Sequence, residues 1–191
     1  MNTHFKKQVN GITSFLKRYG YYVILGVTLC ALAVTILLIV PTNDNLDVGG
    51  DVIVFADPVL NASVLKGYSG TELQYNATLN KWEAHKAIDF LAPSGTNVFA
   101  VYGGTVQSVY TNYMEGTVIV LDHGGGLRTV YKSLDSEVSV EQGGSVEKGQ
   151  VIGVVSDSAT SESADGAHIH FEVWKDGTKI DPSAYLTMED K

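Results

Sequence analysis

The chain has 191 residues, among them 13 basic and 21 acidic ones, and a formal net charge of −8. This length suits one folded domain with appendages, and the acidic balance argues against nucleic acid as a partner. The only cysteine is Cys30, so an intramolecular disulfide is excluded.

A basic arm at residues 1–20 precedes an uncharged, apolar segment at residues 21–40. Twenty helical residues span about 30 Å, the thickness of a bilayer core, so we predict one transmembrane helix there. The alternative is a cleaved signal peptide, but its apolar region is usually only about 7–15 residues long. Basic residues lie before the segment and acidic residues after it, which predicts a cytoplasmic N-terminus and an extracytoplasmic C-terminal domain.

Beyond the predicted helix, residues 41–50 are typical of a polar linker, and residues 51–82 indicate an extension of strand and loop character. From residue 97 onward, short runs rich in β-branched residues alternate with glycine-containing turns, the clearest turn being Gly124–Gly126. The runs are residues 98–102, 105–110 and 117–121. This pattern predicts an all-β fold, an antiparallel β-sandwich or barrel-like domain.

Two short motifs combine histidine with carboxylate: His85-x-x-x-Asp89, and His168-Ile169-His170. In a strand His168 and His170 point to the same side. Nitrogen and oxygen donors of this kind suit Zn²⁺, and three protein ligands would leave the fourth position open, as in catalytic sites. A His-x-His pair on its own is common on exposed strands. Four residues of straight strand span about 13 Å, so joint metal binding by His85 and Asp89 requires a bend between them.

The strings Glu83-Ala-His85-Lys-Ala-Ile-Asp89-Phe and Ala-His168-Ile-His170-Phe-Glu resemble the signature of the M23 (LytM, lysostaphin-type) zinc peptidases. The resemblance covers about residues 83–186 and leaves a tail at residues 187–191. It implies an all-β LytM-like domain in which His85, Asp89 and His170 bind Zn²⁺ and His168 is a catalytic histidine.

The chain departs from the M23 pattern at Ser133, in the string Tyr131-Lys132-Ser133-Leu134. Active members carry a second catalytic histidine at this position. A serine hydroxyl does not exchange protons near neutral pH as an imidazole does, and general acid–base catalysis contributes roughly 10²–10⁴-fold. His123 is a substitute in principle, but it belongs to an Asp-His-Gly turn that active members also have, and we interpret it as structural.

The run from Gly67 to Trp82, leading into the His85 motif, resembles clostridial members of the stage II sporulation protein Q family. So does the order of basic arm, single helix and C-terminal LytM-like domain. The resemblance implies a forespore membrane protein that faces the mother cell during engulfment. Its implied partner is a mother-cell protein of the stage III AH type, and its implied role is that of a scaffold or channel subunit.

Two functions therefore remain open. One is a zinc-binding scaffold that docks a partner through a sheet edge or groove and is anchored in the membrane by residues 21–40. The other is an anchored zinc metalloendopeptidase that cleaves peptidoglycan peptides, with peptidoglycan as its binding partner. The replacement of a proton-handling histidine by Ser133 favours the scaffold.

Overall fold

The computed structural model describes residues 17–22, 24–32 and 53–187. Residues 17–22 and 24–32 are helical. Among the described residues, no helix is both long and apolar enough to cross a bilayer. Residues 23 and 33–40 of the predicted transmembrane helix lie outside the described part of the chain, so this expectation stays a prediction.

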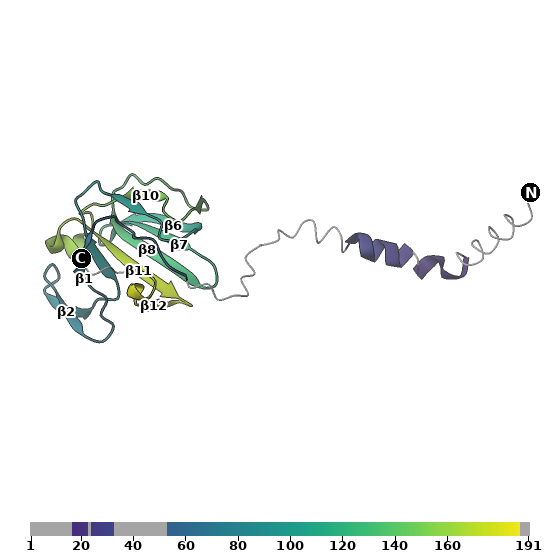
Figure 1. The fold of residues 1–191 in the computed structure, drawn as a ribbon, viewed down its shortest axis with the longest axis horizontal. Coiled ribbons are helices and arrows are strands. Elements are labelled where there is room, and N and C mark those ends of the chain that lie inside the picture. Colours follow the sequence, from purple (N-terminus) through teal and green to yellow (C-terminus); the bar gives the residue numbers. More distant parts are fainter. Residues whose placement is uncertain (1–16, 23, 33–52, 188–191) are drawn as a thin grey trace, which may run out of the picture. The chain divides into compact units, whose positions relative to one another are not determined.

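The chain divides into two compact units, residues 1–51 and residues 52–191, and every described strand belongs to the second (Figure 1). The strands are β1 (Ser63–Lys66), β2 (Leu73–Asn76), β3 (Lys81–Ala84), β4 (Ile88–Leu91), β5 (Asn97–Phe99), β6 (Gly104–Asn112), β7 (Gly116–Asp122), β8 (Leu127–Leu134), β9 (Ser145–Val146), β10 (Val151–Val154), β11 (His168–Lys175) and β12 (Thr178–Ile180). Two short 3-10 helices, η1 (Thr160–Asp165) and η2 (Pro182–Ala184), complete the unit.

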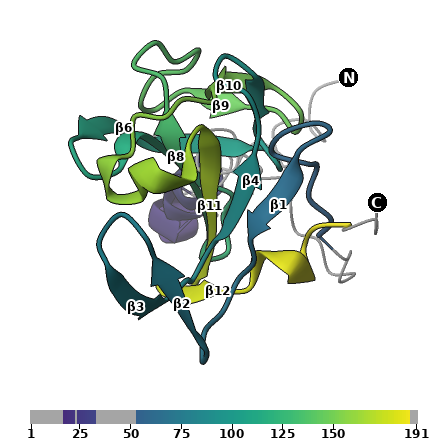
Figure 2. The same cartoon turned by 90° about the vertical axis from the view of Figure 1, so that its left-hand side faces the viewer.

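One antiparallel sheet carries the strands in the order β1-β4-β11-β8-β7-β6-β9, and β12 pairs with β11. Two small sheets, β5–β10 and β2–β3, are added to it. The predicted all-β, antiparallel fold is confirmed. Figure 2 shows β4 and β11 side by side, with β1 outside β4. Because β1 joins this sheet, the segment before residue 83 shares the fold of the segment after it.

The two faces of the sheet differ, as β11 illustrates. Its residues Ile169, Phe171 and Val173 are buried in the single hydrophobic core cluster, to which the small β5–β10 sheet adds Val98 and Ile152. The alternate residues of β11 are polar or aromatic and lie on the opposite face. Because side chains alternate along a strand, one face of the sheet packs in the core and the other carries the polar side chains of the candidate site. In the described part of the chain, every residue of this cluster follows residue 52, so the second unit has a core of its own.

The turn between β7 and β8 has the residues that its geometry requires. Gly124, Gly125 and Gly126 all have positive φ, between 56° and 79°, a conformation that glycine adopts at no steric cost. The prediction of a turn at Gly124–Gly126 is confirmed. The predicted run at residues 98–102 is strand only as far as Phe99, where β5 ends.

Candidate metal centre

The sheet register brings the three predicted metal ligands together. β4 pairs with β11 so that Asp89 lies opposite His170. His85 follows the end of β3, and a bend at Ala87 separates it from β4. The bend that the His85-x-x-x-Asp89 spacing requires is therefore present, and the three side chains meet on the face of the sheet away from the core.

Four buried atoms at this meeting point have no hydrogen-bond partner: His85 Nε2, both carboxylate oxygens of Asp89, and His170 Nδ1. They lie close to one another, with His85 Nε2 3.1 Å from Asp89 Oδ2 and His170 Nδ1 2.9 Å from Asp89 Oδ1, but no hydrogen bond joins them. Unpartnered buried polar groups are rare because each costs about 1–3 kcal/mol. Their concentration at one point indicates a ligand.

The hydrogen bonds of the outer ring nitrogens determine which nitrogen of each histidine is available as a metal ligand. His85 Nδ1 lies 3.0 Å from the carbonyl oxygen of Gly67, and His170 Nε2 lies 3.2 Å from Glu172 Oε1. Each of these nitrogens donates its hydrogen to an oxygen, which leaves the other nitrogen free to act as a ligand. Such outer partners are the usual support for a metal-binding imidazole.

Glu172 is the residue that holds His170 in place, and its own carboxylate is fully engaged. Trp174 Nε1 donates to it at 2.7 Å, and the ammonium groups of Lys132 and Lys179 lie 2.8 Å from it. Although burial opposes ionisation, these partners and His170 hold the pKa of Glu172 well below its ordinary value. Glu172 has the same strand parity as His168 and His170, and this parity is the sequence signal that could have identified it.

A fourth side chain, which the sequence did not predict, completes the cluster. Glu162 lies in η1, and its Oε2 is 3.4 Å from His170 Nδ1. One potential ligand atom from each of His85, Asp89, Glu162 and His170 lies within 4.8 Å of the others. We call these four residues the metal cluster. No periodic pattern surrounds Glu162, so nothing in the sequence marked it.

The electrostatics of the metal cluster favour a cation. Burial raises the pKa of both carboxyls, but the neighbouring imidazoles more than offset this and hold the pKa values of Asp89 and Glu162 below their ordinary values. Burial lowers the pKa of His170, whereas the carboxylates of Asp89 and Glu162 raise it well above the usual range. Two ionised carboxylates therefore share a proton-binding site with His170, and metal binding would release that proton.

The donor set fits zinc. Ligand atoms bonded to a tetrahedral zinc at about 2.0–2.2 Å lie about 3.3–3.6 Å apart. The shortest donor separations are 2.9–3.4 Å, and two of them involve different oxygens of Asp89. One donor atom from each of the four residues lies within 4.8 Å of the others, so side-chain shifts would bring the donors to this geometry. Two imidazoles with one or two carboxylates are donors that zinc prefers, so His85, Asp89 and His170 would hold the ion.

His168 lies beside the metal cluster, not among the ligand atoms. Its Nδ1 is 2.7 Å from the carbonyl oxygen of Gly166, and its Nε2 is 3.4 Å from Glu162 Oε2. Burial lowers the pKa of this histidine, but the Glu162 carboxylate raises it above the ordinary value. His168 therefore contacts Glu162 and is not itself positioned as a metal ligand.

Ser133 is buried and its hydroxyl is engaged in the structure. It donates to the carbonyl oxygen of Ser156 at 3.0 Å, and the Ser156 hydroxyl donates back to the Ser133 carbonyl at the same distance. The φ angle of Ser133 is 63°, at the end of β8. This reciprocal pair fastens the end of β8 to the segment after β10.

The histidine that we interpreted as structural, His123, is satisfied at both ring nitrogens. Nδ1 lies 2.9 Å from the carbonyl oxygen of Gly103, and Nε2 lies 2.8 Å from the hydroxyl of Thr129. Burial lowers its pKa below the ordinary value. His123 belongs to a hydrogen-bonded network apart from the metal cluster.

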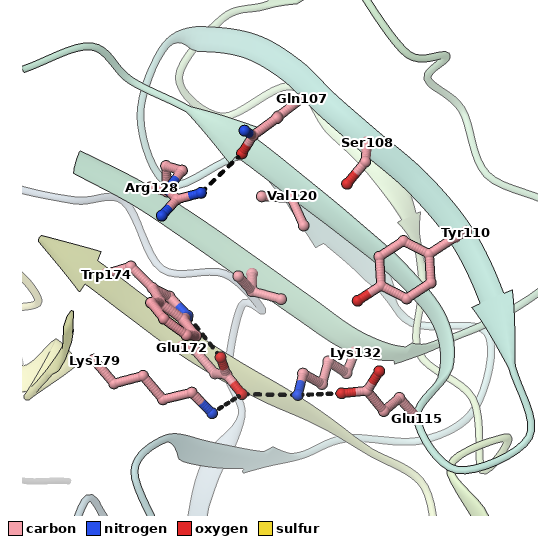
Figure 3. Close-up of a pocket in the computed structure, with 11 residues that line it drawn as sticks. Gln107, Ser108, Tyr110, Glu115, Val120, Arg128, Lys132, Glu172, Trp174 and Lys179 are labelled. Carbon is pink, nitrogen blue, oxygen red and sulfur yellow. Dashed lines mark hydrogen bonds and ion pairs between the residues drawn. The ribbon is translucent and has the colours of Figure 1, made fainter. Parts of the chain in front are cut away.

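A groove runs over the same face of the sheet as the metal cluster (Figure 3). Its cavity measures about 560 Å³, and Trp174, Glu172 and Lys132 lie along its floor. Figure 3 shows Lys132 between the carboxylates of Glu172 and Glu115. The Lys132 ammonium lies 2.8 Å from Glu172 Oε1 and 2.5 Å from Glu115 Oε1. A smaller hollow of about 170 Å³ shares Glu115 and Lys132 with this groove and reaches His170.

This fold and this site define a LytM-like domain. The model of peptidase family M23 matches residues 83–182, about half of the chain, and the chain belongs to that family.

Among known proteins, the chain is 36% identical to stage II sporulation protein Q of Bacillus subtilis (strain 168) over 159 residues. The match covers 75% of this chain and 54% of that protein, so the chain spans about half the length of this relative.

Two solved structures are also similar. "Structure of the SpoIIQ-SpoIIIAH pore forming complex" aligns with a TM-score of 0.63 and 34% identity over 71% of this chain and 92% of that one. A "zinc containing peptidase" from Vibrio cholerae aligns with a TM-score of 0.56 and 26% identity over 65% of this chain and 37% of that one.

Proposed function

We propose that this protein is a zinc-binding LytM-like scaffold that acts in sporulation by docking a mother-cell protein of the stage III AH type. One observation carries the proposal: the relative that shares 34% identity and nearly its whole solved length with this chain is SpoIIQ, which was solved in complex with SpoIIIAH. The role as a channel subunit between forespore and mother cell belongs to the same proposal.

The site supports docking rather than hydrolysis. The position of the second catalytic histidine holds Ser133, whose hydroxyl is bonded to Ser156 within the fold. Without that imidazole, roughly 10²–10⁴-fold of general acid–base assistance is missing. The proposed zinc would then stabilise the end of the sheet where β3, β4 and β11 meet, and would supply little chemistry.

An outer sheet edge offers a surface for the partner. β6 is nine residues long, and in the described part of the chain β9 pairs only with its Gly104 and Thr105. Val106 also exchanges backbone hydrogen bonds with Gly143 and Gly144. Beyond it, from Gln107 to Asn112, the outer backbone donors and acceptors of β6 could accept a strand from another protein. The opposite edge, β1, has four residues, a bulge between Val64 and Lys66 and a lysine at its end, features that discourage pairing.

Exposed hydrophobic side chains at the end of β6 strengthen this choice. Tyr113 is 80% exposed and Met114 is 46% exposed, both in the turn that leads to β7. Large exposed aromatic side chains are enriched in protein interfaces. We therefore propose that the AH-type partner binds along β6 and this turn.

The test measures, by titration calorimetry, the binding of residues 52–191 to the purified AH-type protein of the same organism. We expect Tyr113→Asp to weaken binding at least tenfold. Trp82→Asp is the matched control, because Trp82 is 65% exposed and lies on β3, in a different sheet from β6, and this variant should bind normally. Equal binding by both variants would contradict docking along β6, and no binding by the unmodified domain would contradict the scaffold proposal itself.

Membrane anchoring through residues 21–40 is part of the proposal, with a cytoplasmic N-terminus and an extracytoplasmic domain. A single reactive cysteine tests it: Ser136→Cys, at an exposed position, in a Cys30→Ala background. A membrane-impermeant thiol reagent should label this variant in intact protoplasts. Labelling that requires lysis of the cells would contradict the topology.

The second candidate is an active zinc metalloendopeptidase that cleaves peptidoglycan peptides. The observation that favours it is the set of unpartnered donor atoms on His85, Asp89 and His170, the donors that a catalytic zinc requires. Zinc-dependent release of amino groups from purified peptidoglycan by the unmodified domain would support this candidate over the scaffold.

A further inference from the structure

We propose that the Glu162 carboxylate is a fourth protein ligand, so that the metal cluster forms a closed zinc site. The inference rests on the proposed zinc binding by His85, Asp89 and His170 and adds a specific consequence. A closed tetrahedral site with four protein ligands is structural, whereas a catalytic site keeps one position open.

The position of Glu162 is the first support. Its Oε2 lies 3.4 Å from His170 Nδ1, a separation expected of two ligand atoms on one tetrahedral zinc. The same oxygen is 3.4 Å from His168 Nε2, so a coordinated Glu162 would have an imidazole as its outer partner. The side chain of Glu162 is only 13% exposed.

The absence of a strong counter-ion is the second support. Glu172, another buried carboxylate on this side of the sheet, is neutralised by Lys132 and Lys179. Among the described residues, the ion pairs of Glu162 are with His168 and His170 alone. Burying an ionised carboxylate is costly unless it is paired or coordinates a metal. Glu162 therefore lies where a cation would stabilise it.

The backbone around Glu162 is held from three sides. Ser161 donates through its N–H and its hydroxyl to the carbonyl oxygen of Met114, at 3.1 and 2.7 Å, in the β6–β7 turn. From the β2–β3 hairpin, Asn76 Nδ2 donates to the Ser161 carbonyl at 3.2 Å. At the other end of η1, Lys66 of β1 forms an ion pair with Asp165.

These contacts make Glu162 a preorganised group rather than a mobile arm. Figure 2 shows η1, in light green, next to the β2–β3 hairpin. The φ of Glu162 is −133°, which departs from the helical conformation of its neighbours. Preorganisation lowers the entropic cost of binding, so we expect the Glu162 carboxylate to contribute to metal affinity.

A closed site explains why a serine can occupy position 133, where active members of the family have a histidine. A histidine that handles protons is useful only where a reactant can reach the metal. If Glu162 occupies the fourth position, the second histidine has no task, and a serine that ties β8 to Ser156 serves the fold instead. The competing interpretation is that Glu162 replaces the lost histidine as a proton acceptor beside an open zinc site, and the experiment separates the two.

The experiment uses residues 52–191, the unit with its own core, loaded with Co²⁺ in place of Zn²⁺. The visible absorption of Co²⁺ reports its coordination number, and azide serves as a probe that binds only at an open position. We compare the unmodified domain with Glu162→Ala and Glu162→Gln. Glu115→Gln is the matched control, because Glu115 lines the same hollow but is not in the metal cluster.

We expect the unmodified domain and Glu115→Gln to give a four-coordinate spectrum that azide does not change. Glu162→Ala should give a spectrum that azide changes. Its affinity for Zn²⁺, measured by chelator competition, should fall by at least the roughly 10–100-fold that is lost with an outer partner. Glu162→Gln, which keeps the shape but loses the charge, should also lose affinity.

Two outcomes would overturn the proposal in distinguishable ways. If the unmodified domain binds Co²⁺ and azide changes its spectrum as much as that of Glu162→Ala, the site is open and only the closure is wrong. If the unmodified domain binds no metal while it still unfolds cooperatively, the zinc part of the proposed function fails together with the closure.

Discussion

Two histidine sites in this domain differ in how the ring nitrogens are satisfied. At His123 both ring nitrogens have partners, the carbonyl of Gly103 and the hydroxyl of Thr129. At His85 and His170 only the outer nitrogen has a hydrogen-bond partner, and the inner one faces Asp89 without a hydrogen bond. The residue type is the same at the two sites, so residue type alone does not identify a candidate ligand site.

The distinguishing quantity is the number of unsatisfied polar atoms. A buried polar atom without a partner destabilises the fold, and a protein keeps a group of them only where something else satisfies them. The ring nitrogens of His123 have partners within the fold, whereas the buried donor atoms of the metal cluster have no hydrogen-bond partner, and the proposed zinc would satisfy them.

The largest effect is loss of the metal. We expect the unmodified domain to carry about one zinc per chain and His170→Ala and His85→Ala to carry none, because each removes one of the ligands. His123→Gln is the control and should keep its zinc. Elemental analysis of the purified proteins measures this, and equal zinc in the unmodified domain and both ligand variants would show that the ion is held elsewhere.

The next effect concerns hydrolysis by variants. Ser133→His alone should leave peptidoglycan uncut, because Glu162 still fills the fourth position. Ser133→His combined with Glu162→Ala should cut faster than Glu162→Ala by part of the roughly 10²–10⁴-fold that general acid–base catalysis provides. The positive φ of Ser133 is one that histidine tolerates. The readout is amino-group release, and cleavage by Ser133→His alone would argue against a closed site.

Metal removal should destabilise the domain by a smaller amount. A ligand that binds only the folded state at one hundred times its Kd adds about 2.7 kcal/mol to the free energy of unfolding. Urea unfolding with and without zinc should show this gain for the unmodified domain and for His123→Gln. His170→Ala should show none of it. Zinc binding by the unmodified domain without any shift of its unfolding midpoint would mean that the folded and unfolded chains bind the ion equally.

The smallest effect is a pH dependence at His123. Burial lowers the pKa of this histidine in the folded state, so unfolding takes up a proton once the pH falls below the ordinary value of about 6.5. Its contribution to stability is therefore complete above that pH and is lost as the pH falls, with a slope of at most about 1.4 kcal/mol per pH unit.

The difference between the zinc-free domain and its His123→Gln variant isolates this slope, because the histidines of the metal cluster titrate in both. Urea unfolding between about pH 7.5 and 5 measures it. Parallel stability curves for the two proteins would show that His123 does not take up a proton on unfolding.

Much of this arrangement was predictable from local patterns. The alternation in β11 and the three glycines at Gly124–Gly126 predicted the strand faces and the turn, because both depend on neighbouring residues alone. The convergence of His85, Asp89 and His170 was predicted from two short motifs together with the M23 resemblance, and the register of β4 against β11 brings these residues into contact.

The rest depends on contacts between distant segments. Glu162 lies in an irregular helix with no periodic signal, and it reaches His170 only because the β2–β3 hairpin and the β6–β7 turn hold η1 in place. The role of Ser133 in fastening β8 to Ser156 also depends on tertiary pairing. Propensity and spacing describe neighbours along the chain, so they do not reveal such partners.

The most direct test of the scaffold proposal is the action of the zinc-loaded, unmodified domain on purified peptidoglycan. New amino groups are counted over time, with the metal-free domain as the control, and the same preparation is tested for binding to the AH-type partner. If the protein is a scaffold, we expect partner binding and no amino-group release above the metal-free control. Robust, zinc-dependent release would contradict it and identify the protein as a peptidoglycan hydrolase.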